Sequence, residues 1–441
     1  MSRAPLENVT TLPSGEHSQQ AEFIVATSQL PPDGGYGWVC VLAQFLINGF
    51  TWGVAASYSV YLAYFLSHDL FTEAKPIDYA FIGGFNFAFA LLVAPLATLL
   101  MRLYDVQAPM LLGVISLPAG FIAASFSTRV WHLYLSLGVC VGLGIGLIYI
   151  PATSVVPQWF TKRRSLASGI CAAGSGIGGL IVCFSTQAML DSLGLVWSFR
   201  ITAVVVFFVN LAATLLIRSR NKEIEPDQRM FNFHLLGNYH VQLFLGWSII
   251  LMFGYITLMF SLSDYAVAIG RSDRDSATVA AILNLGAALG RPVIGYISDR
   301  YGRLEVAGIL TFTCGILVFA MWIPATEYAI LVAFSLISGA ILGVFWAVAA
   351  PLAADIVGLK ELPAFLSLTW LSVVLPSAVA EVIALELRRP GHGARSYLYP
   401  QIFTGISYVL SSILLFELWR SRRKAANLGR LGSWQSELGT I

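Results

Sequence analysis

Long apolar stretches alternate with short polar segments along almost the whole chain. Each stretch holds about 20 residues or more, which is the length that an α-helix needs to cross the hydrocarbon core of a bilayer. The pattern predicts an all-α membrane protein. Its predicted transmembrane helices are at residues 38–64, 79–101, 108–127, 131–156, 165–190, 196–217, 239–263, 277–298, 304–323, 328–350, 364–387 and 397–418, twelve in total.

The amino-acid composition excludes a soluble globular protein. The 441 residues are 57% hydrophobic and 11% charged, whereas a soluble domain carries about 25% charged residues. A net charge of +2 gives no reason to expect a nucleic acid partner. The glycine-rich runs at 142–146 and 174–179 lie inside apolar stretches with no preceding strand, so they indicate close helix packing rather than dinucleotide binding. No phosphate-binding loop is present, and no cofactor is predicted.

Basic residues set the expected orientation. The even-numbered loops and the C-terminal tail hold 16 Lys and Arg residues, and the odd-numbered loops hold 7. Because cytoplasmic loops carry the excess of basic residues, both termini are expected to be cytoplasmic, next to anionic lipid. Residues 1–30 are expected to form a disordered tail and residues 421–441 a basic tail. The plasma membrane is the expected location, with the vacuolar membrane as the alternative.

A polar segment at 218–238 divides the chain into two halves. The N-terminal bundle is expected at 31–217 and the C-terminal bundle at 239–420, each with six spans. The segment from Pro95 to Asp105 also leaves the second span much as Pro292 to Gly302 leaves the eighth. Two related halves with a binding site between them are typical of secondary transporters.

A charged motif follows the eighth span. The run from Gly295 to Arg303 reads G-x-x-x-D-R-x-G-R, in which glycines permit a tight turn and a carboxylate lies beside two guanidinium groups. It resembles the loop signature of the major facilitator superfamily. The resemblance implies that the motif ties helix ends together during the transport cycle. The gating residues that it implies are Gly295, Asp299, Arg300, Gly302 and Arg303.

Two further segments resemble a narrower family. Residues 32–38, Pro-Asp-Gly-Gly-Tyr-Gly-Trp, resemble the signature that precedes the first span of the monocarboxylate porters. Residues 151–169 resemble the passage from the fourth to the fifth span of the same family, particularly in its fungal branch. These matches imply the two-bundle major facilitator fold and a small-molecule substrate.

Arg291 is the principal candidate for binding that substrate. A charge at the centre of a transmembrane helix costs about 2.5 to 3.5 kcal/mol and is seldom kept without a partner. Asn284 lies two turns earlier on the same face, and in monocarboxylate porters the matching arginine receives the carboxylate. A purely structural ion pair is the alternative. Other polar or aromatic residues could also line the cavity, although helix packing explains them equally well. The candidate substrate-binding residues among them are Gln44, Asn48, Tyr149 and Trp370, and Asn86 and Trp346 are further possible lining residues.

The chain departs from the animal members of that family at two positions. Ala56 and Ala287 stand where those members carry a lysine and an aspartate that are associated with proton coupling. The absence of this lysine and this aspartate argues against proton-linked transport of the lactate type. Glu381, in the eleventh apolar stretch, is then the candidate proton site.

The sequence as a whole predicts a secondary active or facilitative transporter of a small organic anion, a monocarboxylate-like metabolite, that works by alternating access. Efflux of a fungal secondary metabolite is the alternative, and a nutrient receptor on the same scaffold is a further one. An enzyme is not predicted, because the six histidines lie in tails, in loops or near span ends and no catalytic cluster or metal site emerges. Neither the direction of transport nor an ancillary membrane protein is encoded in any motif.

Overall fold

The structure is a computed structural model that describes residues 31–68, 76–226, 232–389 and 393–438. The predicted tail at 1–30 lies outside these ranges. Within them every regular element is a helix, and ten helices are long and apolar enough to cross a membrane. Two of the ten are double. One bends at Gly194 and the other at Gly358, where φ is 77° and 79°, so all twelve predicted apolar stretches are accounted for.

The first half of the chain forms one bundle. Its helices are α2 (Gly37–Phe50), α3 (Trp52–Ala56), α4 (Tyr58–His68), α5 (Pro76–Leu92), α6 (Ala94–Tyr104), α7 (Gln107–Ala124), α8 (Val130–Leu133), the π-helix η1 (Tyr134–Cys140), α9 (Val141–Trp159) and α10 (Arg164–Leu216). A connecting segment follows, with α11 (Asn221–Ile224) and the 3₁₀ helix η2 (Phe233–Gly237).

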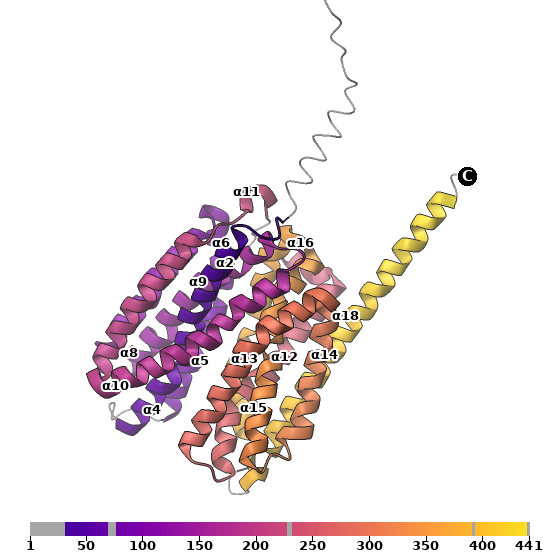
Figure 1. The fold of residues 1–441 in the computed structure, drawn as a ribbon. Coiled ribbons are helices and arrows are strands. Elements are labelled where there is room, and N and C mark those ends of the chain that lie inside the picture. The colour runs from indigo at the N-terminus through magenta and orange to yellow at the C-terminus, as the bar shows by residue number, and fades with distance from the viewer. Residues whose placement is uncertain (1–30, 69–75, 227–231, 390–392, 439–441) are drawn as a thin grey trace, which may run out of the picture.

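The second half forms the other bundle, beside the first (Figure 1). Its helices are α12 (Tyr239–Ala268), α13 (Asp273–Tyr301), α14 (Arg303–Leu317), the π-helix η3 (Val318–Trp322), α15 (Tyr328–Leu342), α16 (Val344–Ser372), α17 (Val374–Leu387), the 3₁₀ helix η4 (Gly393–Tyr397) and α18 (Leu398–Leu438). The predicted basic tail at 421–441 is thus helical as far as Leu438, because α18 continues past the end of the last apolar stretch at 418.

Four of the spans are broken near their middle. The first is interrupted at Thr51, whose hydroxyl donates to the carbonyl of Ile47 at 2.6 Å and so competes with the helical hydrogen bonds. The second is interrupted at Val93, just before Pro95, which has no N–H to continue the ladder. The other two breaks are at Gly343 and Val373 in the second half. Broken helices at this depth are typical of transporters, whose substrate sites use them.

Glycines bring several helices into backbone contact. A Cβ atom at Gly49 or Gly53 would approach the backbone of α10 near Gly178, so α2 and α3 lie directly on α10. The same holds between the halves, where a Cβ at Gly169 of α10 would meet the backbone of Arg291 in α13. This close approach places Arg291 at the boundary between the two bundles.

One end of the molecule carries both ends of the described chain. The start of α2, α11 and the part of α18 that extends beyond the bundle lie at this end (Figure 1). We call it the terminal face and define it by residues 31–37, 159–165, 217–225, 299–303 and 355–361. Large exposed side chains such as Phe184, Phe208 and Leu289 lie along the bundles instead, as expected where a bilayer surrounds the helices.

Candidate substrate-binding site

Arg291 extends from α13 of the second half towards α10 of the first. Its Nη1 donates to the backbone carbonyl of Ala172 at 2.6 Å and to the hydroxyl of Ser175 at 2.5 Å. Only 6% of the residue is exposed. No ion pair in the described part of the chain includes this guanidinium, so its charge meets neutral acceptors alone.

The remaining surroundings of Arg291 are aromatic hydroxyls and a glycine. Tyr255 of α12 and Tyr149 of α9 lie close enough to interact with its charge. Its side chain runs over Gly343, at the break between α15 and α16, where a Cβ would lie 2.7 Å from Nε. The Nε atom itself is buried and has no hydrogen-bond partner. The guanidinium therefore has a donor left for an anion.

An aromatic cluster extends from this position across the boundary between the halves. Trp346 is stacked on Trp370 with ring centroids 5.7 Å apart and planes at 12°, and Trp52 of the first half lies 6.1 Å from Trp346. The ring of Tyr149 lies between two of these indoles, with its centroid 5.4 Å from that of Trp52 and 5.9 Å from that of Trp370. We define the aromatic cluster as Trp52, Phe87, Tyr149, Tyr255, Phe345, Trp346 and Trp370.

The structure brings some of the predicted substrate residues together and leaves others apart. Arg291, Tyr149 and Trp370 lie in one site. Asn284 is exposed, and its amide donates to the carbonyl of Ala280 in its own helix. Asn48 is buried and likewise donates within its helix, to the carbonyl of Gln44. None of the hydrogen bonds among the described residues links these two asparagines to Arg291.

Gln44 is buried, and its Oε1 has no partner. It precedes Trp52 by about two helical turns, on the same broken span. The predicted proton site, Glu381, belongs to α17, but its side chain lies outside the described residues. The roles of both residues stay predictions.

Sequence reasoning missed several members of the aromatic cluster. Trp52 was missed, although it lies directly after the helix break at Thr51. Trp346, which the sequence had indicated as a possible cavity residue, lies three residues after the break at Gly343. A tryptophan beside a hydroxyl or glycine that interrupts an apolar run was the signal available. Phe87, Tyr255 and Phe345 carried no such signal, because phenylalanine and tyrosine recur throughout the apolar stretches.

Asp299 closes the terminal face between the two halves. Its carboxylate accepts hydrogen bonds from the backbone N–H groups of Ser165 at 3.0 Å and Leu166 at 2.8 Å, at the start of α10. The first N–H groups of a helix have no partner within it, and they favour negative charge. Asp299 of the second bundle therefore caps a helix of the first.

Arg303 and Arg164 complete this connection. Arg303 donates to Asp299 at 3.1 Å, to the carboxylate of Asp355 at 2.6 Å and to the carbonyl of Thr161 in the first half at 2.6 Å. Arg164 pairs with Asp355 across the boundary at 3.1 Å. We call Arg164, Ser165, Asp299, Arg303 and Asp355 the latch. Arg164 is one of the basic residues counted above for orientation, and its pairing with Asp355 was not predicted.

The other residues of the predicted gating motif differ in what they contact. Gly295 lies against Ser165, whose backbone a Cβ would strike, and Gly302 adopts φ 107° in the turn before α14. Arg300 is exposed and lies over the ring of Tyr301 in its own helix. It makes no described contact with the first half, so within the described residues it is outside the latch.

Asp105 occupies the place in the first half that Gly302 has in the second, and both have a positive φ. Asp105 accepts hydrogen bonds from Ser219 at 3.2 Å and Asn221 at 3.0 Å, both in the segment that connects the bundles. Asp33, in the segment before α2, accepts from the backbone of Thr161 at 2.7 Å. The acidic residues of the terminal face thus hold backbone turns and the connecting segment in place.

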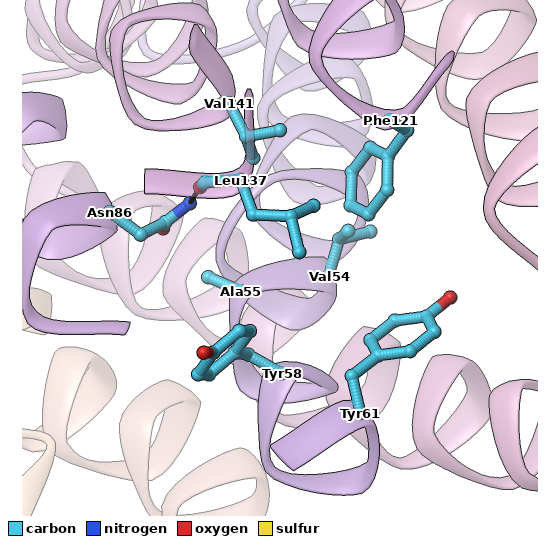
Figure 2. Close-up of a pocket in the computed structure, with 8 residues that line it drawn as sticks. All are labelled: Val54, Ala55, Tyr58, Tyr61, Asn86, Phe121, Leu137 and Val141. Carbon is cyan, nitrogen blue, oxygen red and sulfur yellow. Dashed lines mark hydrogen bonds between the residues drawn. The ribbon is translucent and has the colours of Figure 1, made fainter. Parts of the chain in front are cut away.

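A small pocket lies inside the first bundle, apart from the aromatic cluster. Figure 2 shows its lining and the hydrogen bond from Asn86 to the carbonyl of Leu137 in η1, 2.8 Å long. The cavity measures ≈ 10 Å³, which is about the space of a single water molecule. It is too small for a metabolite. The lining residues are Val54, Ala55, Tyr58, Tyr61, Asn86, Phe121, Leu137 and Val141.

Comparisons with known proteins agree with this architecture. The chain is 37% identical to the protein named Probable transporter MCH2 of Saccharomyces cerevisiae, over 86% of this chain and 81% of that one. It is 27% identical to Monocarboxylate transporter 12 of Mus musculus, over 87% and 86%. It is also 25% identical to the Fujikurins efflux protein of Gibberella fujikuroi, over 90% and 85%.

A solved structure shows the same fold. The transporter FucP in its outward conformation superposes with a TM-score of 0.61 at 14% identity, over 85% of this chain and 98% of that one. The family model of the Major Facilitator Superfamily matches the chain twice, at residues 40–256 and at residues 242–436, so that each half has its own match. The chain therefore belongs to the Major Facilitator Superfamily of membrane transporters, among fungal relatives that are similar to the monocarboxylate porters.

Proposed function

We propose that the protein carries a small organic anion across the membrane by alternating movement of the bundles 31–217 and 239–420, with Arg291 as the anion-binding residue. One observation carries the proposal. Arg291 is buried at the boundary between the bundles, has no acidic partner among the described residues and keeps Nε without a hydrogen bond. Such a charge needs a ligand, water or another helix as its partner.

The contacts of Arg291 also suggest how binding would act on the transport cycle. With the latch closed, Nη1 is held by Ala172 and Ser175 of α10. A substrate carboxylate would compete for the same guanidinium, because a carboxylate forms stronger hydrogen bonds than a neutral carbonyl or hydroxyl. Substrate binding would then loosen a contact between the bundles.

The positive-inside pattern supports placing the terminal face in the cytoplasm. Under this proposal both termini are cytoplasmic, and the closed latch corresponds to a carrier that opens outward. Neither the cytoplasmic position of the termini nor the closed latch fixes the direction of net transport. Export is therefore the second candidate function. Its support is the resemblance to a relative that is named as an efflux protein.

Uptake by proteoliposomes tests the proposal. Purified full-length protein in liposomes is offered labelled carboxylates, their uncharged amides and matched ammonium compounds. We expect uptake of at least one carboxylate above that of protein-free liposomes, and none of its amide. Transport of an amide or an ammonium compound in preference to every carboxylate would contradict it.

Proton coupling gives a separate prediction. Because alanines occupy positions 56 and 287, Glu381 is the embedded carboxylate left to carry a proton. Transport is expected either to ignore an imposed pH gradient or to lose its gradient response in Glu381→Gln. Initial rates with and without a gradient measure this, with Glu386→Gln as the matched control. A gradient response that persists in Glu381→Gln contradicts both alternatives.

A further inference from the structure

The aromatic cluster presents an unusual set of polar atoms beside Arg291. Four buried nitrogen atoms have no hydrogen-bond partner: Nε1 of Trp52, Trp346 and Trp370, and Nε of Arg291. An indole nitrogen only donates, and so does a guanidinium. The site therefore holds several unsatisfied donors, on residues that join the two halves.

Unsatisfied indoles alone do not define a site. Trp322, in the second half, also has a buried Nε1 without a partner, and it is packed against Phe334 and Tyr265 with no exposed surface. Trp52 and Trp346 differ from it because both are only half-buried. They also lie at helix breaks and on opposite sides of the boundary that opens in a transport cycle.

We propose that the substrate is a planar conjugated carboxylate with further hydrogen-bond acceptors on its ring system, rather than a short aliphatic monocarboxylate. The inference rests on the proposed function, in which Arg291 receives the carboxylate. The ring system stacks on the two half-buried indoles, Trp52 and Trp346, with Trp370 packed behind Trp346, and its acceptors take up the indole donors.

The size of the cluster supports this substrate class. Successive tryptophan rings are 6.1 Å and 5.7 Å apart. An anion of the size of lactate can bind the guanidinium, but it has no flat face to stack on these rings. A conjugated ring offers flat faces for stacking, and ring oxygens or nitrogens offer acceptors. Both features match what the protein presents.

A series of four carboxylates tests the proposal on the unmodified protein. Lactate, cyclohexanecarboxylate, benzoate and 4-acetylbenzoate are titrated calorimetrically into purified full-length protein. We expect benzoate to bind about tenfold more tightly than lactate, through ring stacking. Cyclohexanecarboxylate should fall between them, and 4-acetylbenzoate should bind most tightly. Equal affinity for lactate and benzoate, or tighter binding of cyclohexanecarboxylate than of benzoate, overturns the proposal.

Tryptophan variants test the donors separately from the rings. Trp52→Phe, Trp346→Phe and Trp370→Phe keep a ring but remove the N–H group. At least one should weaken the binding of 4-acetylbenzoate about fivefold more than it weakens the binding of benzoate. Trp322→Phe is the matched control and should change neither. If all three variants bind both ligands as the unmodified protein does, the donors have no role and the proposal is wrong.

The two proposals fail in different ways. Arg291→Lys should weaken the binding of all four carboxylates, with or without a ring. If it does and the four ligands do not follow the expected order, the inference about the ring system fails while the anion site stands. If Arg291→Lys leaves all four unchanged, the proposed function fails, and the ring inference fails with it.

Discussion

Asp299→Asn is expected to slow transport by tenfold or more while leaving the protein folded and inserted. The carboxylate accepts two backbone N–H groups at the start of α10 and pairs with Arg303. Hydrogen bonds to a charged group contribute about 1.5 to 3 kcal/mol each. An amide keeps one acceptor oxygen but loses the charge, so we expect the closed terminal face to lose about 2 to 3 kcal/mol. That is a shift of roughly 30- to 150-fold towards the open state.

Two measurements check this expectation. Substrate uptake in proteoliposomes gives the rate, and thiol labelling at Ser298→Cys reports the opening of the terminal face, since Ser298 is fully buried beside the latch. Labelling should rise when Asp299→Asn is added. Asp191→Asn is the matched control, because Asp191 is exposed and bonded only to Gln187 within its own helix. A wild-type rate with unchanged labelling would show that Asp299 does not hold the face closed.

Arg291→Lys should weaken substrate binding by about tenfold or more, and Arg291→Ala should weaken it further. Lysine keeps the charge but lacks the planar fork that grips a carboxylate through two parallel hydrogen bonds. In this structure Nη1 of Arg291 already donates hydrogen bonds to the carbonyl of Ala172 and the hydroxyl of Ser175. An ammonium in this position can satisfy those acceptors but cannot offer the same geometry to a ligand. Alanine removes the cation altogether.

Calorimetric affinity and a thermal unfolding curve on the same purified samples separate binding from folding. Arg300→Lys is the matched control, because Arg300 is exposed on the same helix and lies over the ring of Tyr301, away from the site. We expect its affinity and unfolding temperature to equal those of the unmodified protein. If Arg291→Lys and Arg291→Ala both bind substrate normally, or if both only unfold, Arg291 is a structural tie between α13 and α10.

The features that sequence reasoning found have signals confined to one helix or loop. Length and hydropathy were enough for the spans, because each lipid-crossing helix must satisfy its own backbone. Arg291 was visible because an embedded charge is rare, and Asp299 because its loop motif is compact. At Gly194 and Gly358 the backbone leaves helical geometry with a positive φ, so each glycine separates two of the predicted spans.

The features that were missed depend on residues far apart in the chain. Asp355 and Arg164 are 191 residues apart, and nothing near either one indicates the other. The aromatic cluster likewise combines two helices from the first half, at Trp52 and Tyr149, with α16 of the second. Which faces of two bundles meet is decided by glycine contacts and crossing geometry, and a single sequence does not specify these.

The distribution of charge in the latch has a consequence for the response to membrane voltage. Arg164 and Arg303 are matched by Asp299 and Asp355, so opening the latch moves no net charge through the electric field. Among the described side chains, the buried arginines are Arg164, Arg220 and Arg291, and Arg291 alone lies away from the terminal face. Under the proposed function, an empty carrier reorients with one uncompensated positive charge, whereas a bound monoanion cancels it. A membrane potential of 100 mV acts on one elementary charge with about 2.3 kcal/mol, so it should govern the return of the empty carrier and leave the loaded step electrically silent.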